Sequence, residues 1–120
     1  RIAIMNYLLK NRIHPTADMI FNDLYVEMPT LSRTTVYNTL KLLVEEKAVQ
    51  MITIDEKNVR YDADTAVHAH FKCRKCDGIF DIPISEPAEI KLWRKNGFII
   101  DDIQIYCRGY CKDCTKTKFD

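Results

Sequence analysis

The stretch His68-Ala-His-Phe-Lys-Cys-Arg-Lys-Cys-Asp-Gly-Ile-Phe-Asp81 gathers two imidazoles, two thiols and a closing carboxylate into one short segment. His68 and His70 alternate, so both side chains point to one face if the segment begins as a strand. Cys73 and Cys76 have the C-x-x-C spacing of a zinc knuckle. The segment therefore predicts a strand that leads into a metal-binding turn.

A second C-x-x-C pair follows the first after residues 77–110. One such pair can be a redox site, whereas two pairs in a chain of 120 residues are typical of a tetrathiolate zinc site. The alternative, a set of reduced thiols without metal, gives no reason for the matched spacing. We predict one structural Zn²⁺ bound by Cys73, Cys76, Cys111 and Cys114.

The overall composition restricts the class of protein only weakly. The chain has 18 Lys and Arg against 17 Asp and Glu, so any case for DNA binding must rest on a local motif. No apolar run is long enough to span a bilayer and no signal peptide is visible, so we expect no membrane partner. Five cysteines, four of them in matched pairs, fit a reducing compartment, which predicts a cytoplasmic protein.

The first half of the chain has the pattern of three helices. Residues 1–10 are amphipathic, so we expect the chain to begin inside or just before a helix, with N-terminal residues missing. Pro15 biases His14 away from helical geometry, and Thr16 can cap a second helix. Apolar residues of this second helix lie at helical spacing, at Ala17, Ile20, Phe21, Leu24 and Tyr25. A third helix is predicted over residues 33–46, with Val36, Leu40, Leu43 and Val44 buried.

A two-stranded hairpin is predicted directly after these helices. Residues 48–54 and 59–62 read as strands, and residues 55–58 as the turn between them. Three helices followed by a hairpin is the order of a winged helix-turn-helix. We therefore predict an α+β chain with a winged-helix domain over residues 1–63.

Residues 64–120 are predicted to form a small α/β domain that contains the zinc site. Residues 68–73 and 79–84 read as strands, and Pro83 places the second of them at an edge. A helix is predicted from Pro87 to about Asn96, with Ile90 and Trp93 inward and Gly97 at its end. Residues 98–106 read as a further strand, followed by the partly buried Cys107.

The exposed face expected for the third helix carries small polar side chains, a tyrosine and an asparagine. Asparagine suits adenine, apolar atoms suit the thymine methyl, and hydroxyls at a helix N-terminus suit phosphates. The alternative is a merely solvated face, but the hairpin, with Lys57 and Arg60 placed like a wing, favours duplex DNA. The candidate DNA contacts are Ser32, Arg33, Thr34, Tyr37, Asn38, Lys41 and Lys57.

All three histidines of the chain fall at connector or domain-boundary positions. Each histidine or aspartate, taken alone, is more simply a surface polar residue. Together, imidazole and carboxylate suit Fe²⁺, Mn²⁺, Zn²⁺ or Ni²⁺, and the affinity order alone does not select iron. The candidate ligands of a regulatory metal are His14, Asp62, His68, His70 and Asp81. Ligands from both domains would make their relative pose depend on metal.

Five ordered motifs resemble the ferric uptake regulator family over nearly the whole chain. They are His14-Pro-Thr-Ala-Asp18, Thr35-Val-Tyr-Asn-Thr-Leu40, Arg60-Tyr-Asp62, His68-x-His-x-x-Cys-x-x-Cys76 and Cys111-x-x-Cys114. The resemblance implies a homodimeric, metal-dependent bacterial repressor rather than an enzyme. It also implies an N-terminal winged helix, a C-terminal dimerisation domain with structural zinc, and a near-palindromic operator.

Within this family the chain is most similar to the peroxide-sensing branch. That branch has Asp where iron sensors have Glu after the knuckle, and this chain has Asp81. The resemblance implies Fe²⁺ or Mn²⁺ as the regulatory metal, and oxidation of His14 and His68 to 2-oxo-histidine when Fe²⁺ meets peroxide. The chain departs from the family at Asp77, which precedes Gly78, and in a longer approach to the second cysteine pair.

Three alternatives remain at this point. The chain could be an iron-, zinc- or manganese-responsive repressor of the same family. It could be a zinc enzyme that uses His68, His70 and a carboxylate around a water, or a zinc-stabilised interaction module without DNA binding. Binding to duplex DNA that weakens steeply with salt would separate a repressor from the last two.

Overall fold

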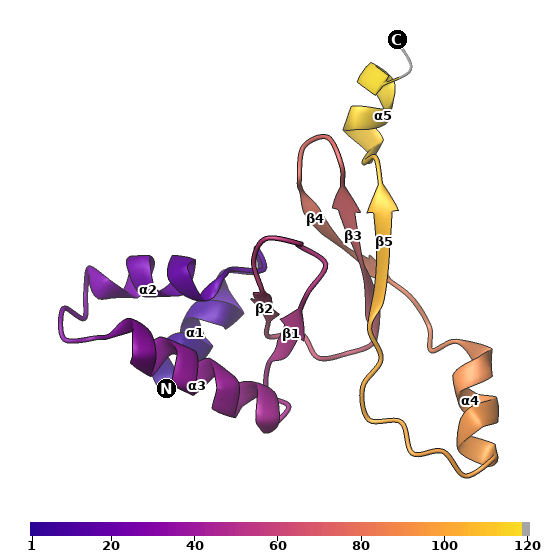
Figure 1. Cartoon of the computed structure of the whole chain (residues 1–120), viewed down its shortest axis with the longest axis horizontal. Helices are drawn as coiled ribbons and strands as arrows, with labels where there is room; N and C mark the ends of the chain where they lie inside the picture. Colours follow the sequence, from indigo (N-terminus) through magenta and orange to yellow (C-terminus); the bar gives the residue numbers. More distant parts are fainter. Residues whose placement is uncertain (119–120) are drawn as a thin grey trace. The chain divides into compact units, whose positions relative to one another are not determined.

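The computed structural model describes residues 1–118 of the chain, which forms two compact units, Arg1–Thr65 and Ala66–Asp120. The first unit has three helices and a small hairpin, and the described part of the second has a three-stranded sheet and two helices; Figure 1 shows their arrangement within each unit. Within residues 1–118, every helix is too short or too polar to cross a membrane.

The first unit is built on helices α1 (Ile2–Lys10), α2 (Ala17–Tyr25) and α3 (Arg33–Glu45). They enclose one apolar core, formed by Ile4, Tyr7, Leu8, Ala17, Ile20, Val36, Leu40, Leu43, Val49 and Tyr61. The side chain of Thr16 caps α2 as predicted, accepting a hydrogen bond from the amide of Met19 (3.2 Å). The side chain of Ser32 caps α3 in the same way, accepting from the amide of Thr35 (3.1 Å). The three predicted helices are therefore confirmed, and the bounds of α1 and α3 differ from the predicted ones by one residue.

One predicted core residue of α2 lies outside the core. Tyr25 is 47% exposed, because it is the last residue of the helix and its ring packs on Phe21 instead, at a centroid distance of 5.3 Å. The apolar spacing predicted the buried face of the helix correctly, but it did not show that the neighbouring helices stop covering this face before Tyr25.

The hairpin of the first unit consists of β1 (Gln50–Ile52) and β2 (Arg60–Asp62), which pair antiparallel. Both strands are shorter than predicted. The amides of Ala48 and Val49 bond to the carbonyl of Leu43 and so close the end of α3 rather than extending the ladder. Residues 53–59 form the connection, called the wing loop below. On the other side of β2, Thr16 forms an isolated antiparallel bridge with Arg60.

The sheet of the second unit has the strand order β4-β3-β5, with β3 (His68–Cys73) in the centre. Strand β4 (Ile79–Pro83) pairs with it antiparallel and β5 (Ile105–Gly109) pairs with it parallel. Pro83 lies on an edge strand, as predicted. The register sets His70 opposite Asp81, so the histidines and this carboxylate share one face of the sheet. The apolar side chains of Phe71, Phe80 and Ile82 lie on the other face.

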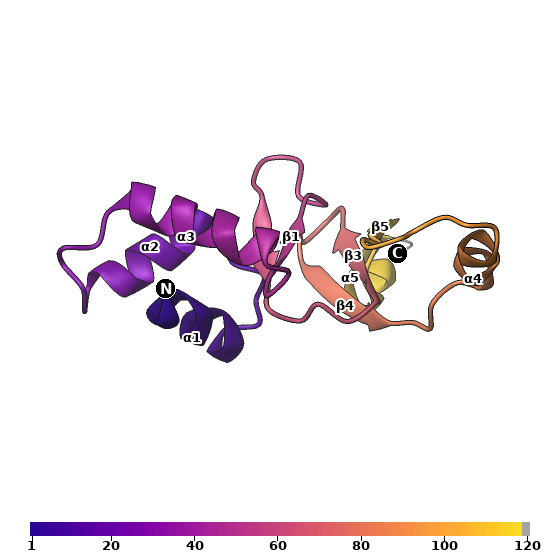
Figure 2. The ribbon, with the colours of Figure 1, turned by 90° about the horizontal axis from the view of Figure 1, so that it is seen from below.

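Helix α4 (Ala88–Lys95) connects β4 to β5, and Gly97 follows it at φ 94°. Every residue of α4 is at least partly exposed, and Figure 2 shows the helix apart from the sheet. The prediction that Trp93 points inward is therefore wrong, since its side chain is 50% exposed. The amphipathic pattern predicted a helix with an apolar face but not what covers that face.

The last predicted strand is displaced along the chain. Residues 98–104 are irregular, and β5 begins only at Ile105, where it can pair with Ala69. Cys107 is exposed rather than partly buried, because β5 is an edge strand of this sheet. The segment that contains the second cysteine pair continues as helix α5 (Lys112–Lys118).

Candidate metal centres and nucleic-acid interface

The four paired cysteines meet at one end of the sheet of the second unit. Cys73 ends β3, Cys76 lies in the following turn, Cys111 follows β5 and Cys114 is in α5. Their sulfur atoms all lie within 4.8 Å of one another, and Cys76 Sγ is 3.9 Å from Cys111 Sγ. A tetrahedral zinc site with Zn–S bonds of about 2.3 Å has sulfur–sulfur edges of about 3.8 Å. The four thiols therefore fit a structural Zn²⁺.

The turn between Cys73 and Cys76 is closed by the residues that follow it. Asp77 adopts φ 60°, a left-handed conformation that Asp tolerates better than most residues, and its amide donates to the Cys73 carbonyl at 3.0 Å. A Cβ atom on Gly78 would lie 3.0 Å from the Phe80 ring and 3.3 Å from Cys76 Sγ. The order Asp-Gly thus keeps the knuckle turn despite its departure from the family pattern.

Backbone amides and neighbouring thiols act in opposite directions on the ionisation of the cluster. Burial raises the pKa of Cys73, but amide hydrogen bonds, including those from Cys76 (3.5 Å) and Cys111 (3.4 Å), outweigh it and lower the pKa to about 6. The pKa of Cys114 is raised to about 12, chiefly by its hydrogen bond with Cys111 and then by burial. A divalent cation would remove this conflict, because it stabilises all the thiolates together.

In the first unit, His14 and Asp62 form a buried pair. The Nε2 atom of His14 is 3.5 Å from Asp62 Oδ2, and the side chains are 5% and 6% exposed. Asp62 Oδ1 accepts a hydrogen bond of 2.9 Å from the amide of Asp64, which fixes the carboxylate. His14 adopts φ 55°, which is uncommon for a residue other than glycine. The carboxylate of Asp62 is therefore held in place by a backbone hydrogen bond.

In the second unit, His68, His70 and Asp81 form a compact cluster. The two Nε2 atoms are 3.0 Å apart, and they lie 3.4 Å and 3.3 Å from Asp81 Oδ1. His68 Nδ1 is 2.7 Å from the carbonyl of Ala66, which places the ring proton on Nδ1 and leaves the Nε2 lone pair for a ligand. Such a set of imidazole and carboxylate donors fits a divalent transition metal.

The exposed face of α3 carries the residues predicted to contact DNA. Tyr37 is 50% exposed, while Val36, Leu40 and Leu43 on the opposite face are buried. The other exposed residues of this candidate interface are Ser32, Arg33, Thr34, Asn38 and Lys41 at the helix and Lys57 in the wing loop. Arg33 also forms an ion pair with Asp18 and lies over the Phe21 ring at 4.6 Å, so it joins α3 to α2.

Two features were not predicted from the sequence. Arg60, expected to lie like a wing residue, is instead largely shielded and donates hydrogen bonds to Asp55 and to the carbonyl of His14. The sequence Arg60-Tyr-Asp62 could have indicated this position of Arg60, because residues two apart on a strand point to the same face, and Asp62 was already a candidate metal ligand.

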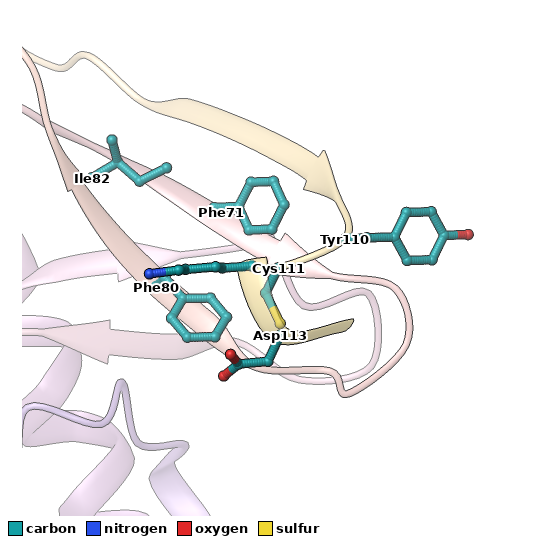
Figure 3. A pocket seen from close by; sticks show the side chains of 7 residues that line it. Phe71, Phe80, Ile82, Tyr110, Cys111 and Asp113 are labelled. Atoms are coloured by element: carbon teal, nitrogen blue, oxygen red, sulfur yellow. The ribbon is translucent and has the colours of Figure 1, made fainter. Parts of the chain in front are cut away.

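The second feature is a cavity of about 340 Å³ on the apolar face of the sheet, at the start of α5. Figure 3 shows the side chains around it, which are those of Phe71, Phe80, Ile82, Tyr110, Cys111, Lys112 and Asp113. Phe80 and Ile82 are 44% and 40% exposed although both are large and apolar. The period-2 pattern of β4 could have indicated this second apolar face.

Comparison with known proteins agrees with this combination of a winged helix, a four-thiol site and imidazole–carboxylate clusters. Residues 1–108 match the ferric uptake regulator family, and the chain belongs to that family. The resemblance of its sequence motifs is thereby confirmed.

Among curated relatives, the chain is 32% identical to the peroxide-responsive repressor PerR of Staphylococcus epidermidis over 116 residues, which cover 95% of this chain and 77% of that protein. It is 33% identical to the peroxide operon regulator of Bacillus subtilis over 118 residues, which cover 97% of this chain and 81% of that protein.

Solved structures show the same likeness. The Campylobacter jejuni peroxide stress regulator matches with a TM-score of 0.74 and 26% identity, over 94% of this chain and 87% of that chain. The Helicobacter pylori ferric uptake regulator also has a TM-score of 0.74, at 19% identity, over 93% of this chain and 79% of that chain. The latter likeness concerns the fold alone.

Proposed function

We propose that this chain is a metal-dependent transcriptional repressor that binds duplex DNA and responds to peroxide. The observation that carries the proposal is the cluster of His68, His70 and Asp81, whose ligand atoms lie within hydrogen-bonding or ion-pairing distance of one another. Membership of the ferric uptake regulator family and relatives named as peroxide-responsive repressors support it.

The regulatory metal would be Fe²⁺ or Mn²⁺, bound by His14, Asp62, His68, His70 and Asp81. Octahedral sites for such ions use about six donors, and neither the pair in the first unit nor the cluster in the second supplies that many. One ion shared by both groups would restrain the two units relative to each other, and only that restrained state would fit the operator.

Fe²⁺ supplies the ability to react with peroxide, which Mn²⁺ lacks. Asp81 is 41% exposed beside the buried His68, so a small polar oxidant can reach the cluster from solvent. His14 and His68 are the residues that would gain oxygen. An oxidised imidazole ring is a poor donor, so the metal would be released and DNA binding lost. The zinc-bound thiolates would be protected in their closed site.

The test is peptide mass spectrometry on the Fe²⁺ protein, prepared without oxygen and then treated with peroxide. Peptides that contain His14 or His68 should gain the mass of one oxygen atom, and operator binding should fall in step. The Mn²⁺ protein should bind DNA and ignore peroxide. Cys107→Ser is the matched control, because this exposed thiol lies outside the four-cysteine cluster. Oxidation of cysteine before histidine would contradict the proposal.

We further propose a homodimer in the cytoplasm that recognises a near-palindromic operator. The apolar cavity beside Phe80 and Ile82 and the exposed apolar side chains of Leu92 and Trp93 are surfaces that a second copy of the chain would cover. The twofold axis of such a dimer would present two copies of α3 to successive major grooves. Four cysteines in two matched C-x-x-C pairs suit zinc binding in a reducing compartment.

The runner-up is a repressor of the same family that responds to the level of iron, zinc or manganese. It differs in one measurement, because its DNA binding would follow the supply of one metal and would survive peroxide. A zinc enzyme is disfavoured, because family members are regulators and such a reading leaves the exposed face of α3 unused.

A further inference from the structure

One side chain ties the wing loop to the metal-ligand pair of the first unit. Arg60 Nη1 donates a hydrogen bond of 2.9 Å to the carbonyl oxygen of His14. Its Nε donates a hydrogen bond of 3.0 Å to Asp55 Oδ2 in the wing loop. The planar guanidinium group thus bridges the backbone of a candidate metal ligand and a loop far from it in sequence.

The strand register explains why Arg60 reaches His14. Arg60 and Asp62 are two positions apart on β2, so both point to the same side of the strand. Asp62 lies beside the imidazole of His14, and Arg60 donates to the carbonyl oxygen of His14. His14 is therefore held at both its side chain and its backbone. Pro15, which follows His14 in the chain, is also held by β2, because its carbonyl accepts a hydrogen bond of 3.0 Å from the amide of Tyr61. A left-handed φ of 55° persists only where surrounding contacts fix it in this way.

The other end of the bridge determines the path of the wing loop. Asp55 uses Oδ2 for Arg60 and accepts a hydrogen bond of 2.9 Å from the amide of Lys57 at Oδ1. This contact turns the backbone at Lys57, whose side chain is a candidate DNA contact. The side chains of Arg60 and Asp55 are only 22% and 9% exposed, so solvent does not screen their ion pair as it would a surface pair.

We propose that Arg60 is a positioning residue that couples metal binding at His14 and Asp62 to the order of the wing loop. The inference rests on the proposed function, because it takes these two residues as ligands of the regulatory metal. Metal held by the imidazole restrains residue 14, Arg60 transmits the restraint from its carbonyl to Asp55, and Asp55 fixes the turn at Lys57. By linkage, DNA bound at the wing strengthens metal binding by the same factor.

Arg60→Lys is the first variant to test this coupling. Lysine keeps a positive charge beside Asp55, but one ammonium group cannot reproduce the two directed contacts of the guanidinium fork. Arg12→Lys is the matched control, because Arg12 is an exposed arginine of the same unit that lies 4.0 Å from Asp64. Three quantities are measured for each protein: Mn²⁺ affinity, amide hydrogen exchange over residues 55–59 with and without Mn²⁺, and duplex affinity with and without Mn²⁺.

In the wild-type protein and in Arg12→Lys, Mn²⁺ should slow exchange in the wing loop and tighten DNA binding. In Arg60→Lys, Mn²⁺ should still bind, but the slowing should be lost, and the gain in DNA affinity caused by Mn²⁺ should fall by about tenfold. A purely structural role would lower stability without separating Mn²⁺ binding from loop order. The inference is overturned if, in Arg60→Lys, Mn²⁺ slows exchange in the wing loop and increases DNA affinity as much as in the wild-type protein.

A second variant covers the case in which Arg60→Lys does not fold. Asp55→Asn keeps an oxygen for the amide of Lys57 and removes the charge that Arg60 holds, so it should show the same loss of coupling with Mn²⁺ binding kept. Full coupling in Asp55→Asn, or loss of its Mn²⁺ binding, overturns the inference. Failure of the proposed function is distinguishable, because it appears in the wild-type protein as DNA binding that Mn²⁺ does not change.

Discussion

Tyr7 lies inside the core of the first unit, and its hydroxyl donates a hydrogen bond of 2.5 Å to Asp23 Oδ2. Burial raises the pKa of Tyr7 to about 12, and the hydrogen bond and the charge of Asp23 act in the same direction. The folded state therefore favours the neutral phenol. This contact adds a polar link between α1 and α2 to the apolar core that the two helices share.

The pKa of Tyr7 predicts how the stability of the first unit changes in alkali. A raised pKa contributes stability that is complete below the unfolded value, about 10, and is lost as pH rises through the folded value, about 12. The loss should be roughly 2–3 kcal/mol over this range. Denaturant unfolding of wild type and Tyr7→Phe at several pH values measures it. The difference in unfolding free energy between them should shrink as pH rises from 10 to 12; a constant difference would contradict the pKa assignment.

At single residues, the sequence could predict chemistry better than conformation. The types and spacing of cysteine and histidine predicted two kinds of metal donor, because ligand chemistry is a property of the side chain. The left-handed backbone of His14 could not be read from the sequence, because it depends on contacts with Arg60 and Asp62, residues distant in the chain. The same holds for Arg60, whose role follows from its partners and not from its type.

Among the elements, α3 carries the prediction for DNA recognition. Asn38 and Lys41 are both exposed, so replacing either by Ala should change the unfolding free energy by less than about 0.5 kcal/mol. Asn38→Ala should relax preference at one base pair by about 1–3 kcal/mol, since asparagine reads base edges. Lys41→Ala should weaken all duplexes alike and reduce the salt slope by about one. Binding of both variants to matched and mutated operators at several salt concentrations separates base readout from phosphate contact. The assigned roles would be refuted if both variants changed base preference and salt dependence equally.

The helices were predicted more closely than the strands, for a physical reason. A helix forms its backbone hydrogen bonds within one segment, and capping residues such as Thr16 and Ser32 mark where it begins. The local sequence is therefore enough to predict a helix. A strand ends where its partner ends, and this depends on residues elsewhere. Strand β5 therefore begins at Ile105, opposite Ala69, and not at the first apolar residue of its segment. The exposure of Trp93 in α4 has a similar cause, because local pattern does not reveal what covers an apolar face.

At the scale of the whole molecule, the four-cysteine cluster joins segments that are distant in sequence. It connects the end of β3 and its turn to the start of α5, and Cys111 is both a member of the cluster and part of the wall of the apolar cavity. Phe71 and Phe80 form the opposite part of that wall, with ring centroids 6.5 Å apart. If a second copy covers this surface, the state of the zinc site and the state of the dimer are linked.

Removal of one zinc ligand should therefore remove the dimer as well. Cys76→Ser leaves three thiolates, which bind Zn²⁺ too weakly to fix α5, so the wall formed by Cys111 and Lys112 should be lost. Zinc analysis and analytical ultracentrifugation should show a zinc-free monomer for this variant. Cys107→Ser, which alters a thiol outside the cluster, should keep both zinc and dimer. Phe80→Asp should keep zinc, because Phe80 is 44% exposed and is not one of the four cysteines, and it should lose the dimer, because the new charge would lie in an apolar contact. A dimer of Cys76→Ser without zinc would show that zinc does not maintain the dimer, and a dimer of Phe80→Asp would place the contact between copies elsewhere.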